Sequence, residues 1–447
     1  MPERSGGTGQ LGGEAAGQNV NDEAELAPSA QTGWGAGEDL LLQALARENM
    51  ARAWKRVKAN KGSAGVDGRT VQDTAQYLKQ AWPEIRCRLL DGSYRPEPVR
   101  RVGIPKPDGG VRELGIPTVV DRLIQQALLQ VLQPILDPTF SEHSYGFRPG
   151  RSAHQAVLAA QAHVQAGHHV VVDVDLEKFF DRVNHDILMD RLAKRIVDRR
   201  VLGLIRRYLQ AGILEHGTRI EREEGTPQGG PLSPLLANVL LDEVDRELER
   251  RGHRFVRYAD DCNVYVRSHK AGARVLQALR GCYARLRLRV NEAKTAVADV
   301  WGRKFLGYRM HRARDGVVKL GVAQQALDKL CHRLRQITRR HRGRSMEWVI
   351  RDLQEYVPGW KNYFRLVQMP AVFRELDSWL RRRLRAVQLN QWKRGSTVYR
   401  ALRRMGASGA LATYVARNTR RWWHCSLRLS RVMNPAYFDE LGVPRFS

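Results

Sequence analysis

The sequence predicts an α+β protein, in which a sheet-containing part is followed by an all-helical part. Residues 170–175 alternate valine and aspartate, and residues 253–257 and 262–266 form apolar runs on either side of a four-residue turn, so we expect a sheet here. After the turn signal Asp315-Gly316, apolar residues recur at helical spacing and no strand pattern returns. This separation of strands from later helices is typical of the α+β class.

The charge balance points to a polyanionic partner. The 447 residues include 75 Lys and Arg against 47 Asp and Glu, which gives a net charge of +28 and a pI near 10.5. The excess is concentrated in residues 301–447, which hold 32 basic and nine acidic residues. A basic surface can serve solubility alone, but a block this uneven favours nucleic acid.

Several other classes of protein are disfavoured. No run of about 18 apolar residues occurs and the N-terminus lacks the apolar core of a signal peptide, so we expect no membrane segment and a cytoplasmic location. The five cysteines are widely spaced and form no Cys-x-x-Cys pair, which disfavours a disulfide framework or a zinc site. Residues 1–38 are rich in Gly, Ala and Gln without apolar periodicity, and we predict a disordered tail.

Acidic residues stand at the ends of the predicted strands. The turn Tyr258-Ala259-Asp260-Asp261 carries two, and the alternation in residues 170–175 puts Asp173 and Asp175 on one face of their strand. Acids in a turn, taken alone, indicate only a solvated hairpin. Carboxylates that converge from two strands repel one another unless cations neutralise them. Two Mg²⁺ ions about 3.5–4 Å apart would do so in phosphoryl transfer.

Two basic motifs precede these strands. Lys106 and Arg112 flank an Asp-Gly-Gly turn and would lie on neighbouring strands, where they could clamp a triphosphate; the alternative is an ordinary exposed hairpin. Arg148 and Arg151 lie beside aromatic residues, either in contact with a nucleic-acid backbone or as a structural arginine turn. Ser152 begins a capping-box pattern, so a helix should follow.

Three further positions could contact a nucleotide. Phe180, five residues after Asp175, could lie under the sugar and exclude a 2′-hydroxyl, although at least one of Phe179 and Phe180 should belong to the core. The glycines of Thr226-Pro227-Gln228-Gly229-Gly230 permit close approach of a ligand, which Gln228 can hydrogen-bond. Lys294, which we expect near the end of a basic helix, is either a proton donor to pyrophosphate or a solvated lysine.

In the second part of the chain, three amphipathic stripes of apolar residues predict a basic helical bundle. Arg381, Arg382, Arg383 and Arg385 surround the third stripe, so most of them should point outward and could bind RNA phosphates. The last fifty residues combine arginines with tryptophans, as single-strand and RNA binders do. The stripes are Leu327, Leu330, Leu334 and Ile337; Ile350, Leu353, Val357, Trp360 and Phe364; and Phe373, Leu376, Leu380, Leu384 and Val387.

Taken together, these segments resemble the sequence blocks of reverse transcriptases in order and spacing. Residues 359–364 and 379–385 are similar to the maturase, or X, domain of group II intron-encoded proteins, and the resemblance covers roughly residues 40–430. The blocks are Lys106…Arg112, Tyr145-Gly146-Phe147-Arg148-Pro149-Gly150-Arg151-Ser152, Asp175…Phe180-Asp181, Pro227-Gln228-Gly229, Tyr258-Ala259-Asp260-Asp261, Lys294 and Phe305-Leu306-Gly307-Tyr308.

The resemblance implies a right-hand polymerase with an antiparallel palm sheet. The expected divisions are a tail (1–38), a helical N-terminal extension (39–98), fingers and palm (99–310), an all-α thumb or maturase domain (311–398) and a basic C-terminal region (399–447). It assigns metal binding to Asp175, Asp260 and Asp261, a catalytic role to Lys294, and nucleotide contact to Lys106, Arg112, Phe180, Gln228, Gly229, Tyr258 and Lys294.

The implied activity is Mg²⁺-dependent, RNA-directed DNA synthesis from dNTPs on a DNA primer or target, combined with binding of the intron RNA to promote its splicing. A His-Asn-His endonuclease with paired Cys-x-x-Cys motifs, present in many relatives, is missing from this sequence, which resembles the compact endonuclease-lacking IIC branch. One alternative is a reverse transcriptase of a retron, defence or CRISPR-linked system, against which the maturase-like helix argues. The other is a non-catalytic splicing factor, against which the intact aspartates argue. The sequence gives no indication of the oligomeric state.

Overall fold

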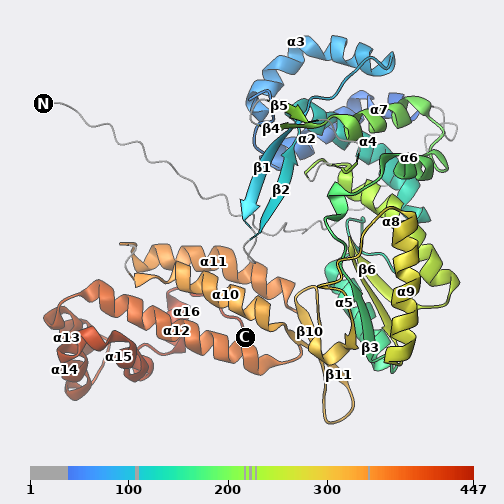
Figure 1. Cartoon of the computed structure of the whole chain (residues 1–447). Coiled ribbons are helices and arrows are strands. Elements are labelled where there is room, and N and C mark those ends of the chain that lie inside the picture. Colours follow the sequence, from blue (N-terminus) through green and yellow to red (C-terminus); the bar gives the residue numbers. More distant parts are fainter. Residues whose placement is uncertain (1–38, 106–109, 216–217, 221–223, 227–228, 341–342) are drawn as a thin grey trace, which may run out of the picture. The chain divides into compact units, whose positions relative to one another are not determined.

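The computed structural model describes residues 39–105, 110–215, 218–220, 224–226, 229–340 and 343–447 (Figure 1). These residues form two compact units, which we call the sheet unit (39–323) and the helical unit (324–447). All three described sheets belong to the first unit, and the second consists of helices. The predicted α+β class is therefore confirmed.

A largely buried helix lies at the centre of the packing in the first part of the sheet unit. α4 (Val119–Leu136) begins at Thr118, whose hydroxyl accepts a hydrogen bond from the Asp121 amide, and most of its side chains are buried. α2 (Arg47–Ala59) packs on α4, and the Asn49 side chain donates a hydrogen bond to the carbonyl of Ala127. The other helices of this part are α1 (Leu40–Ala44) and α3 (Val71–Leu90), with α6 (His185–Ala193) and α7 (Arg199–Gln210) further along the chain.

The palm sheet has the strand order β6-β7-β3-β8, and every neighbouring pair is antiparallel. Val172, Val174 and Val264 are buried in the main core with apolar residues of the helices α8 and α9 (Figure 1). Asp173 lies on the opposite face, as the alternation predicts. The elements are β3 (Val170–Val174), β6 (Arg254–Tyr258), β7 (Asp261–Val266), β8 (Ala296–Asp299), α8 (Ser233–Arg250) and α9 (His269–Arg285).

Two smaller sheets complete this unit. In the first, ordered β2-β1-β4-β5, the predicted hairpin is present as an antiparallel pair of β1 and β2. In the second, the β10–β11 hairpin packs on α5, where the Gln161 side chain donates to the carbonyl of Val318 at 2.7 Å. The hairpin therefore belongs to the sheet unit, which extends past the boundary expected at residue 310. The elements are β1 (Val99–Pro105), β2 (Val111–Ile116), β4 (Ile213–Glu215), β5 (Thr218–Ile220), β9 (Lys304–Phe305), β10 (Tyr308–Arg312), β11 (Val318–Val322) and α5 (Ala153–Gln165).

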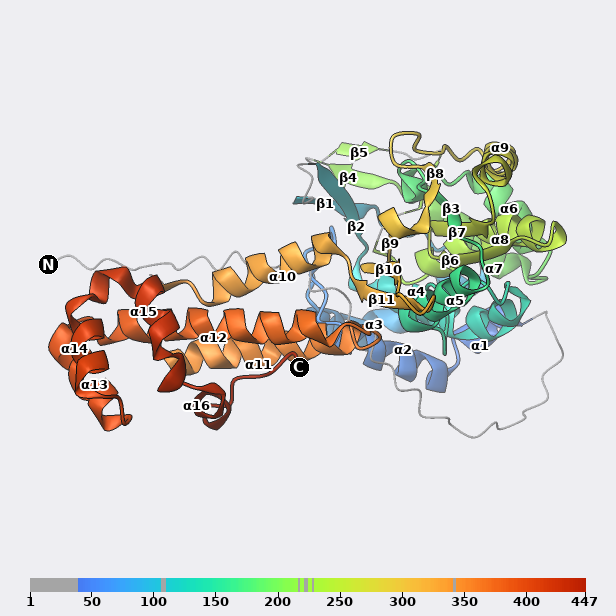
Figure 2. The ribbon, with the colours of Figure 1, turned by 90° about the horizontal axis from the view of Figure 1, so that it is seen from below.

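The helical unit contains the three predicted stripes in one core. Leu334, Leu353 and Leu384, one from each stripe, are fully buried, and Val415 and Phe438 from the C-terminal region share the same core. Figure 2 shows the ribbons of the helices that carry these residues. The expected division between residues 398 and 399 therefore falls inside α13. The helices are α10 (Gln324–Ile337), α11 (Met346–Tyr363), α12 (Pro370–Trp392), α13 (Gly395–Arg404), α14 (Gly409–Arg417), α15 (Trp422–Arg428) and α16 (Pro435–Glu440).

The last residues of the chain dock onto the helices α11 and α12. The buried Asp377 carboxylate accepts hydrogen bonds from the amides of Phe446 and Ser447 at 2.8 and 3.0 Å. The Phe446 ring is buried, edge-on to Trp360 with centroids 5.5 Å apart. No helix in the described parts of the chain is long and apolar enough to cross a membrane.

Candidate active site

The three predicted metal-binding aspartates lie at one edge of the palm sheet. Asp175 directly follows β3, Asp260 is in the turn from β6 to β7, and Asp261 is the first residue of β7. β7 pairs with both β6 and β3. The pKa of Asp261 is raised to about 7, chiefly by burial and then by the charges of Asp260, Asp173 and Asp175. The side chain of Asp261 has exposed surface, but the protein around it removes much of the water near the carboxylate. The edge therefore concentrates negative charge.

This edge fits divalent metal ions by the chemistry of its donors. It offers carboxylate oxygens, which Mg²⁺ prefers, and their mutual repulsion would be relieved by bound cations. Within the described ranges, no group of three or more His, Cys, Asp or Glu side chains is placed so that it could hold a metal ion by itself. Mg²⁺ in proteins usually takes part of its coordination from substrate phosphates and water.

The turn that carries Asp260 has a constrained backbone. Ala259 is buried with φ of +57°, a left-handed conformation that is unusual for alanine. Gly146 approaches it so closely that a Cβ on Gly146 would lie 2.2 Å from the Ala259 nitrogen. The position of the two aspartates therefore depends on what holds this turn.

A buried arginine holds the turn from below. The Arg257 guanidinium is 1% exposed and donates to the carbonyl of Ala259 at 2.9 Å and to the Asn238 side chain at 2.9 Å. It also donates twice from Nε and once from Nη2 to the fully buried Asp245 carboxylate, at 2.6–3.0 Å. The Asn238 amide donates in turn to the carbonyl of Gly146. We did not predict this network, although the charged residue Arg257 in the apolar run of residues 253–257 was a signal for it.

Asp175 is oriented by a turn that follows α9. The Asn291 side chain donates to its Oδ2 at 2.9 Å, and the Thr295 hydroxyl accepts from its backbone amide at 3.2 Å. Lys294 places its Nζ 3.9 Å from the same carboxylate, with a largely exposed side chain. We expected residues 291–295 to end a basic helix, but α9 ends at Arg285. The chain reverses there through Arg287, whose φ is +56°.

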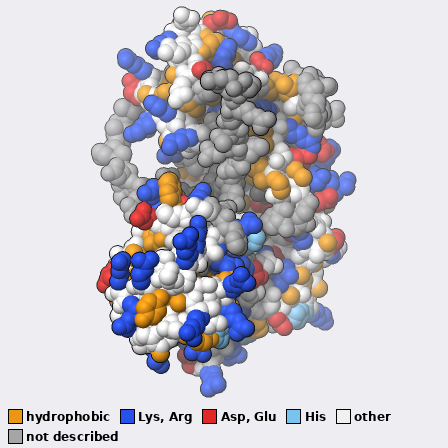
Figure 3. All heavy atoms as spheres, turned by 90° about the vertical axis from the view of Figure 1, so that its left-hand side faces the viewer, with side chains coloured by type: hydrophobic (Ala, Val, Ile, Leu, Met, Phe, Trp, Pro, Cys, Tyr) orange, Lys and Arg blue, Asp and Glu red, His pale blue; other side chains and the backbone are white. Residues whose placement is uncertain are grey.

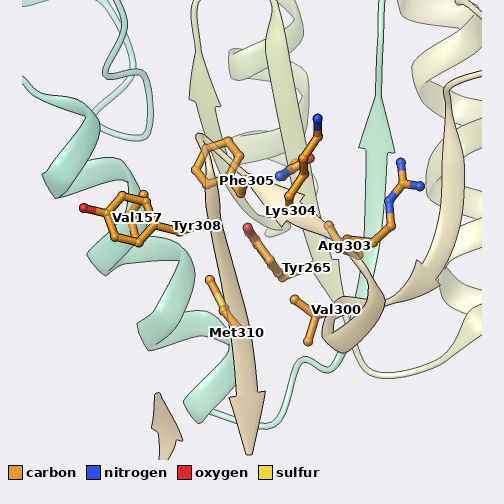
Figure 4. Close-up of a pocket in the computed structure, with 10 residues that line it drawn as sticks. Val157, Tyr265, Val300, Arg303, Lys304, Phe305, Tyr308 and Met310 are labelled. Carbon is orange, nitrogen blue, oxygen red and sulfur yellow. The ribbon is translucent and has the colours of Figure 1, made fainter. Parts of the chain in front are cut away.

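A fourth carboxylate beside the site has its own cation. Arg303 donates from Nε to Asp173 at 3.1 Å and from Nη2 to the carbonyl of Lys294 at 3.2 Å. Arg303 borders a small pocket of about 10 Å³ under the turn from β9 to β10, room for roughly one water. Figure 4 shows the apolar side chains of this pocket, including Tyr308 and Met310, with Arg303 and Lys304 directed away from them. The pocket is packing beneath the site rather than a ligand site.

The structure separates the two phenylalanines after Asp175. Phe179 is 3% exposed in the core, and Phe180 is half-buried, with ring centroids 5.1 Å apart. The Thr226 amide donates to the carbonyl of Phe180 at 2.7 Å, so Thr226 lies beside the backbone of Phe180. Gln228 itself lies outside the described residues. Gly229 has φ of +128°, and a Cβ there would lie 2.7 Å from the carbonyl of Gly115, so its close approach is to β2.

The basic residues predicted in the fingers have different outcomes. Lys106 lies outside the described residues, and the backbone of Arg112 pairs with Ile104 in the β1–β2 hairpin. Arg148 is buried and donates to Asp137 at 2.8 Å and to the carbonyl of Ser144, which is the structural arginine turn rather than a nucleic-acid contact. The charge of Arg148 predicted a surface position. The side chain is buried instead because Asp137, 11 residues earlier in the sequence, neutralises it. Arg151 is half-buried beside the Tyr145 ring.

Comparison with known proteins agrees with this geometry. Residues 104–310 match the family model for reverse transcriptase (RNA-dependent DNA polymerase), and residues 327–406 match the maturase-specific domain of group II introns. Protein YkfC of Escherichia coli (strain K12) is 34% identical over 309 residues, which cover 60% of this chain and 81% of YkfC. This protein belongs to the group II intron-encoded reverse transcriptases.

A second member of the family is longer than this chain. The group II intron-encoded protein LtrA of Lactococcus lactis subsp. cremoris is 30% identical over 335 residues, 60% of this chain and 55% of LtrA. The chain thus spans about half the length of LtrA. Among solved structures, a telomerase from Candida albicans is 13% identical with a TM-score of 0.42, covering 82% of this chain and 68% of that one.

The maturase-specific domain of this reverse transcriptase presents a basic surface. Figure 3 shows many Lys and Arg side chains on one face of the helical unit. Arg381, Arg382 and Arg383 are half-buried, with Arg382 over the Trp423 ring at 4.1 Å and Arg383 donating to the Thr338 hydroxyl. Exposed arginines in the C-terminal part of the helical unit include Arg403, Arg404, Arg417, Arg420 and Arg421.

Arg385 differs from the other three arginines of α12. It is 6% exposed, donates to the carbonyl of Met433 at 2.9 Å and lies over the Phe438 ring at 5.6 Å. Burial, with a contribution from Arg381, lowers its pKa to about 10. This position corrects our expectation that Arg385 contacts RNA, because helical periodicity turns it toward α16.

Proposed function

We propose that this protein is an Mg²⁺-dependent RNA-directed DNA polymerase encoded by a group II intron, and that it also binds the intron RNA as a maturase. The observation that carries the polymerase is the convergence of Asp175 with Asp260 and Asp261 at one edge of an antiparallel sheet. Family membership supports RNA template binding and nucleic-acid substrates, and reverse transcriptases normally use a divalent metal.

In this proposal the reaction joins a primer to a dNTP. When bound, two Mg²⁺ ions would activate the primer 3′-hydroxyl and stabilise the charge on the departing pyrophosphate. The primer oxygen forms a bond to the α-phosphorus while the bond to the bridging oxygen of pyrophosphate breaks. Asp175, Asp260 and Asp261 would hold the ions, and Asn291 fixes the orientation of Asp175.

Two side chains have further roles in the proposed reaction. Lys294, 3.9 Å from Asp175, gives a proton to the departing pyrophosphate. Phe180 lies below the sugar of the incoming dNTP and excludes a 2′-hydroxyl; its half-buried position, against the buried Phe179, supports this choice.

The proposed maturase role falls to the helical unit. Its arginines on α12 and in the C-terminal part would contact phosphates of the folded intron RNA, and DNA target or primer would bind nearby. The side chains of Arg381, Arg382 and Arg383 remain the candidates on α12, whereas Arg385 is structural.

A primer-extension assay tests the polymerase directly. The purified protein is given an RNA template, a DNA primer, dNTPs and Mg²⁺, and is compared with the Asp260→Asn variant. We expect extension by the wild type and a fall of orders of magnitude in the variant. Asp186→Asn, which changes an exposed aspartate on α6 in the same way, should retain activity. Wild-type extension by folded Asp260→Asn protein would refute the assignment.

A further inference from the structure

The palm sheet carries a groove at the end opposite to the aspartates. It has a volume of about 410 Å³ and is formed where β6 begins, β7 ends and α9 begins. Arg254 and Tyr258 stand at the two ends of β6, roughly 13 Å apart at about 3.3 Å per residue. The groove is therefore separate from the candidate active site. Its charged and polar lining residues are His168, Arg251, His253, Arg254, Arg267 and Arg274.

The groove concentrates positive charge that the protein does not neutralise. Arg254, Arg267 and Arg274 are exposed, and none of them has an acidic partner in the described part of the chain. Arg251 is paired with Glu247 at 2.6 Å. No Asp or Glu is among the described residues that line the groove. Three uncompensated guanidinium groups around one small groove form a site for an anion with more than one negative group.

Some exposed arginines of the sheet unit are neutralised by ion pairs, whereas others, such as Arg47, Arg86 and Arg309, have no acidic partner in the described part of the chain. Arg206 pairs with Asp186 at 2.7 Å, Arg250 with Glu247 at 2.8 Å and Arg280 with Glu292 at 2.6 Å. These ion pairs neutralise arginines on the same unit. What distinguishes the groove is that three arginines without an acidic partner line one space of about 410 Å³.

The floor of the groove is apolar. Val266 and Val275 are buried there, and Ala271 and Ala278 complete a surface without polar side chains. Guanidinium groups bind phosphate oxygens through paired hydrogen bonds, and an apolar floor can receive the carbon face of a sugar. The combination fits a sugar-phosphate backbone better than an isolated phosphate ion.

We infer that this groove binds a phosphodiester segment of the intron RNA, outside the polymerase site. The inference rests on the proposed function, because it takes the intron RNA as the ligand. A primer–template duplex is tied to the aspartate edge by the reaction, whereas a folded RNA held for splicing is not. RNA is therefore the nucleic acid assigned to the far end of the sheet.

The test combines Arg254→Gln, Arg267→Gln and Arg274→Gln in one variant. None of the three makes an ion pair in the described chain, so the fold should be retained. Binding of the intron RNA is measured across a range of KCl concentrations. We expect the log–log salt slope to fall by about 2 to 2.7, at roughly 0.7–0.9 per lost phosphate contact. Extension of a preformed primer–template should stay within about twofold of wild type.

A matched variant controls for net charge. Arg206→Gln, Arg250→Gln and Arg280→Gln together remove the same charge from paired arginines of the same unit, and the RNA salt slope should stay near the wild-type value. Equal changes in both variants would overturn the groove as a site. A groove variant that loses duplex DNA binding but keeps RNA binding would overturn the assignment to RNA.

The outcomes also separate this inference from the proposed function. If the wild type binds the intron RNA and the groove variant binds it with unchanged affinity and slope, the groove assignment alone is wrong. If the wild type does not bind the RNA, the maturase proposal fails and the groove assignment fails with it.

Discussion

Replacing the buried pair of Arg257 and Asp245 should lower catalysis without lowering the stability of the fold. Arg257→Met alone leaves the fully buried Asp245 carboxylate without its cation, which should cost about 3–5 kcal/mol of unfolding free energy. The double variant Arg257→Met/Asp245→Leu removes both charges, and such replacements are often neutral or stabilising. We therefore expect the double variant to be about as stable as the wild type in urea unfolding.

Activity should not recover with stability. The double variant still lacks the hydrogen bond from Arg257 to the carbonyl of Ala259, and bonds from charged donors contribute about 1.5–3 kcal/mol. If that energy keeps Asp260 and Asp261 in place, its loss corresponds to a roughly 10- to 100-fold lower kcat at about 1.4 kcal/mol per tenfold. Single-nucleotide incorporation measures kcat and the KM for dNTP separately, and we expect the change chiefly in kcat.

The control is an ion pair away from the turn. Arg191 donates to Glu243 at 2.6 Å between α6 and α8, and Arg191→Met/Glu243→Leu should keep wild-type kcat. Wild-type kcat in a stable Arg257→Met/Asp245→Leu protein would show that the pair acts on stability alone and that the turn holds its own geometry.

Three other predictions concern sugar selection, nuclease activity and the docked C-terminal residues. Phe180→Val should admit ribonucleotides in the extension assay, whereas an unchanged dNTP preference in an active variant would refute the role of Phe180 in sugar selection. Because the sequence has no Cys-x-x-Cys or His-Asn-His motif, the purified protein should not nick duplex DNA, and metal-dependent nicking by a protein without the three aspartates would contradict this. Asp377→Asn weakens the acceptor for the amides of Phe446 and Ser447 and should lower the stability of the helical unit by about 1–3 kcal/mol in urea unfolding; an unchanged midpoint would refute the docking role.

Local patterns in the sequence were sufficient for most of the fold. α3 and α4 each begin after a threonine whose hydroxyl caps the helix, and apolar periodicity follows, so both signals lie within a short window of sequence. The alternation around Asp173 and the hairpin at Ala259 likewise depend on neighbouring residues. These local signals are sufficient to predict that the three aspartates lie at one edge of the sheet.

What could not be predicted depends on partners distant in the chain. The charges of Arg148 and Arg385 favour exposed positions, yet both side chains are buried. The acceptor of Arg148 is 11 residues away in the sequence, and the acceptor of Arg385 is 48 residues away. The support of Asp175 by Asn291 spans 116 residues. The pairing of Asp173 with Arg303 spans 130 residues. A single sequence shows no such pairings, since nothing in residue spacing reports which distant side chains meet.

The most direct test measures both proposed activities on the same proteins. Asp260→Asn and the combined Arg381→Gln, Arg382→Gln, Arg383→Gln variant are each assayed for RNA-templated primer extension and for splicing of the intron RNA. We predict that Asp260→Asn loses extension by orders of magnitude and still splices. The arginine variant should splice poorly at moderate salt and keep more of its extension activity. Loss of splicing in folded Asp260→Asn protein, or unchanged RNA affinity in the arginine variant, would contradict the account.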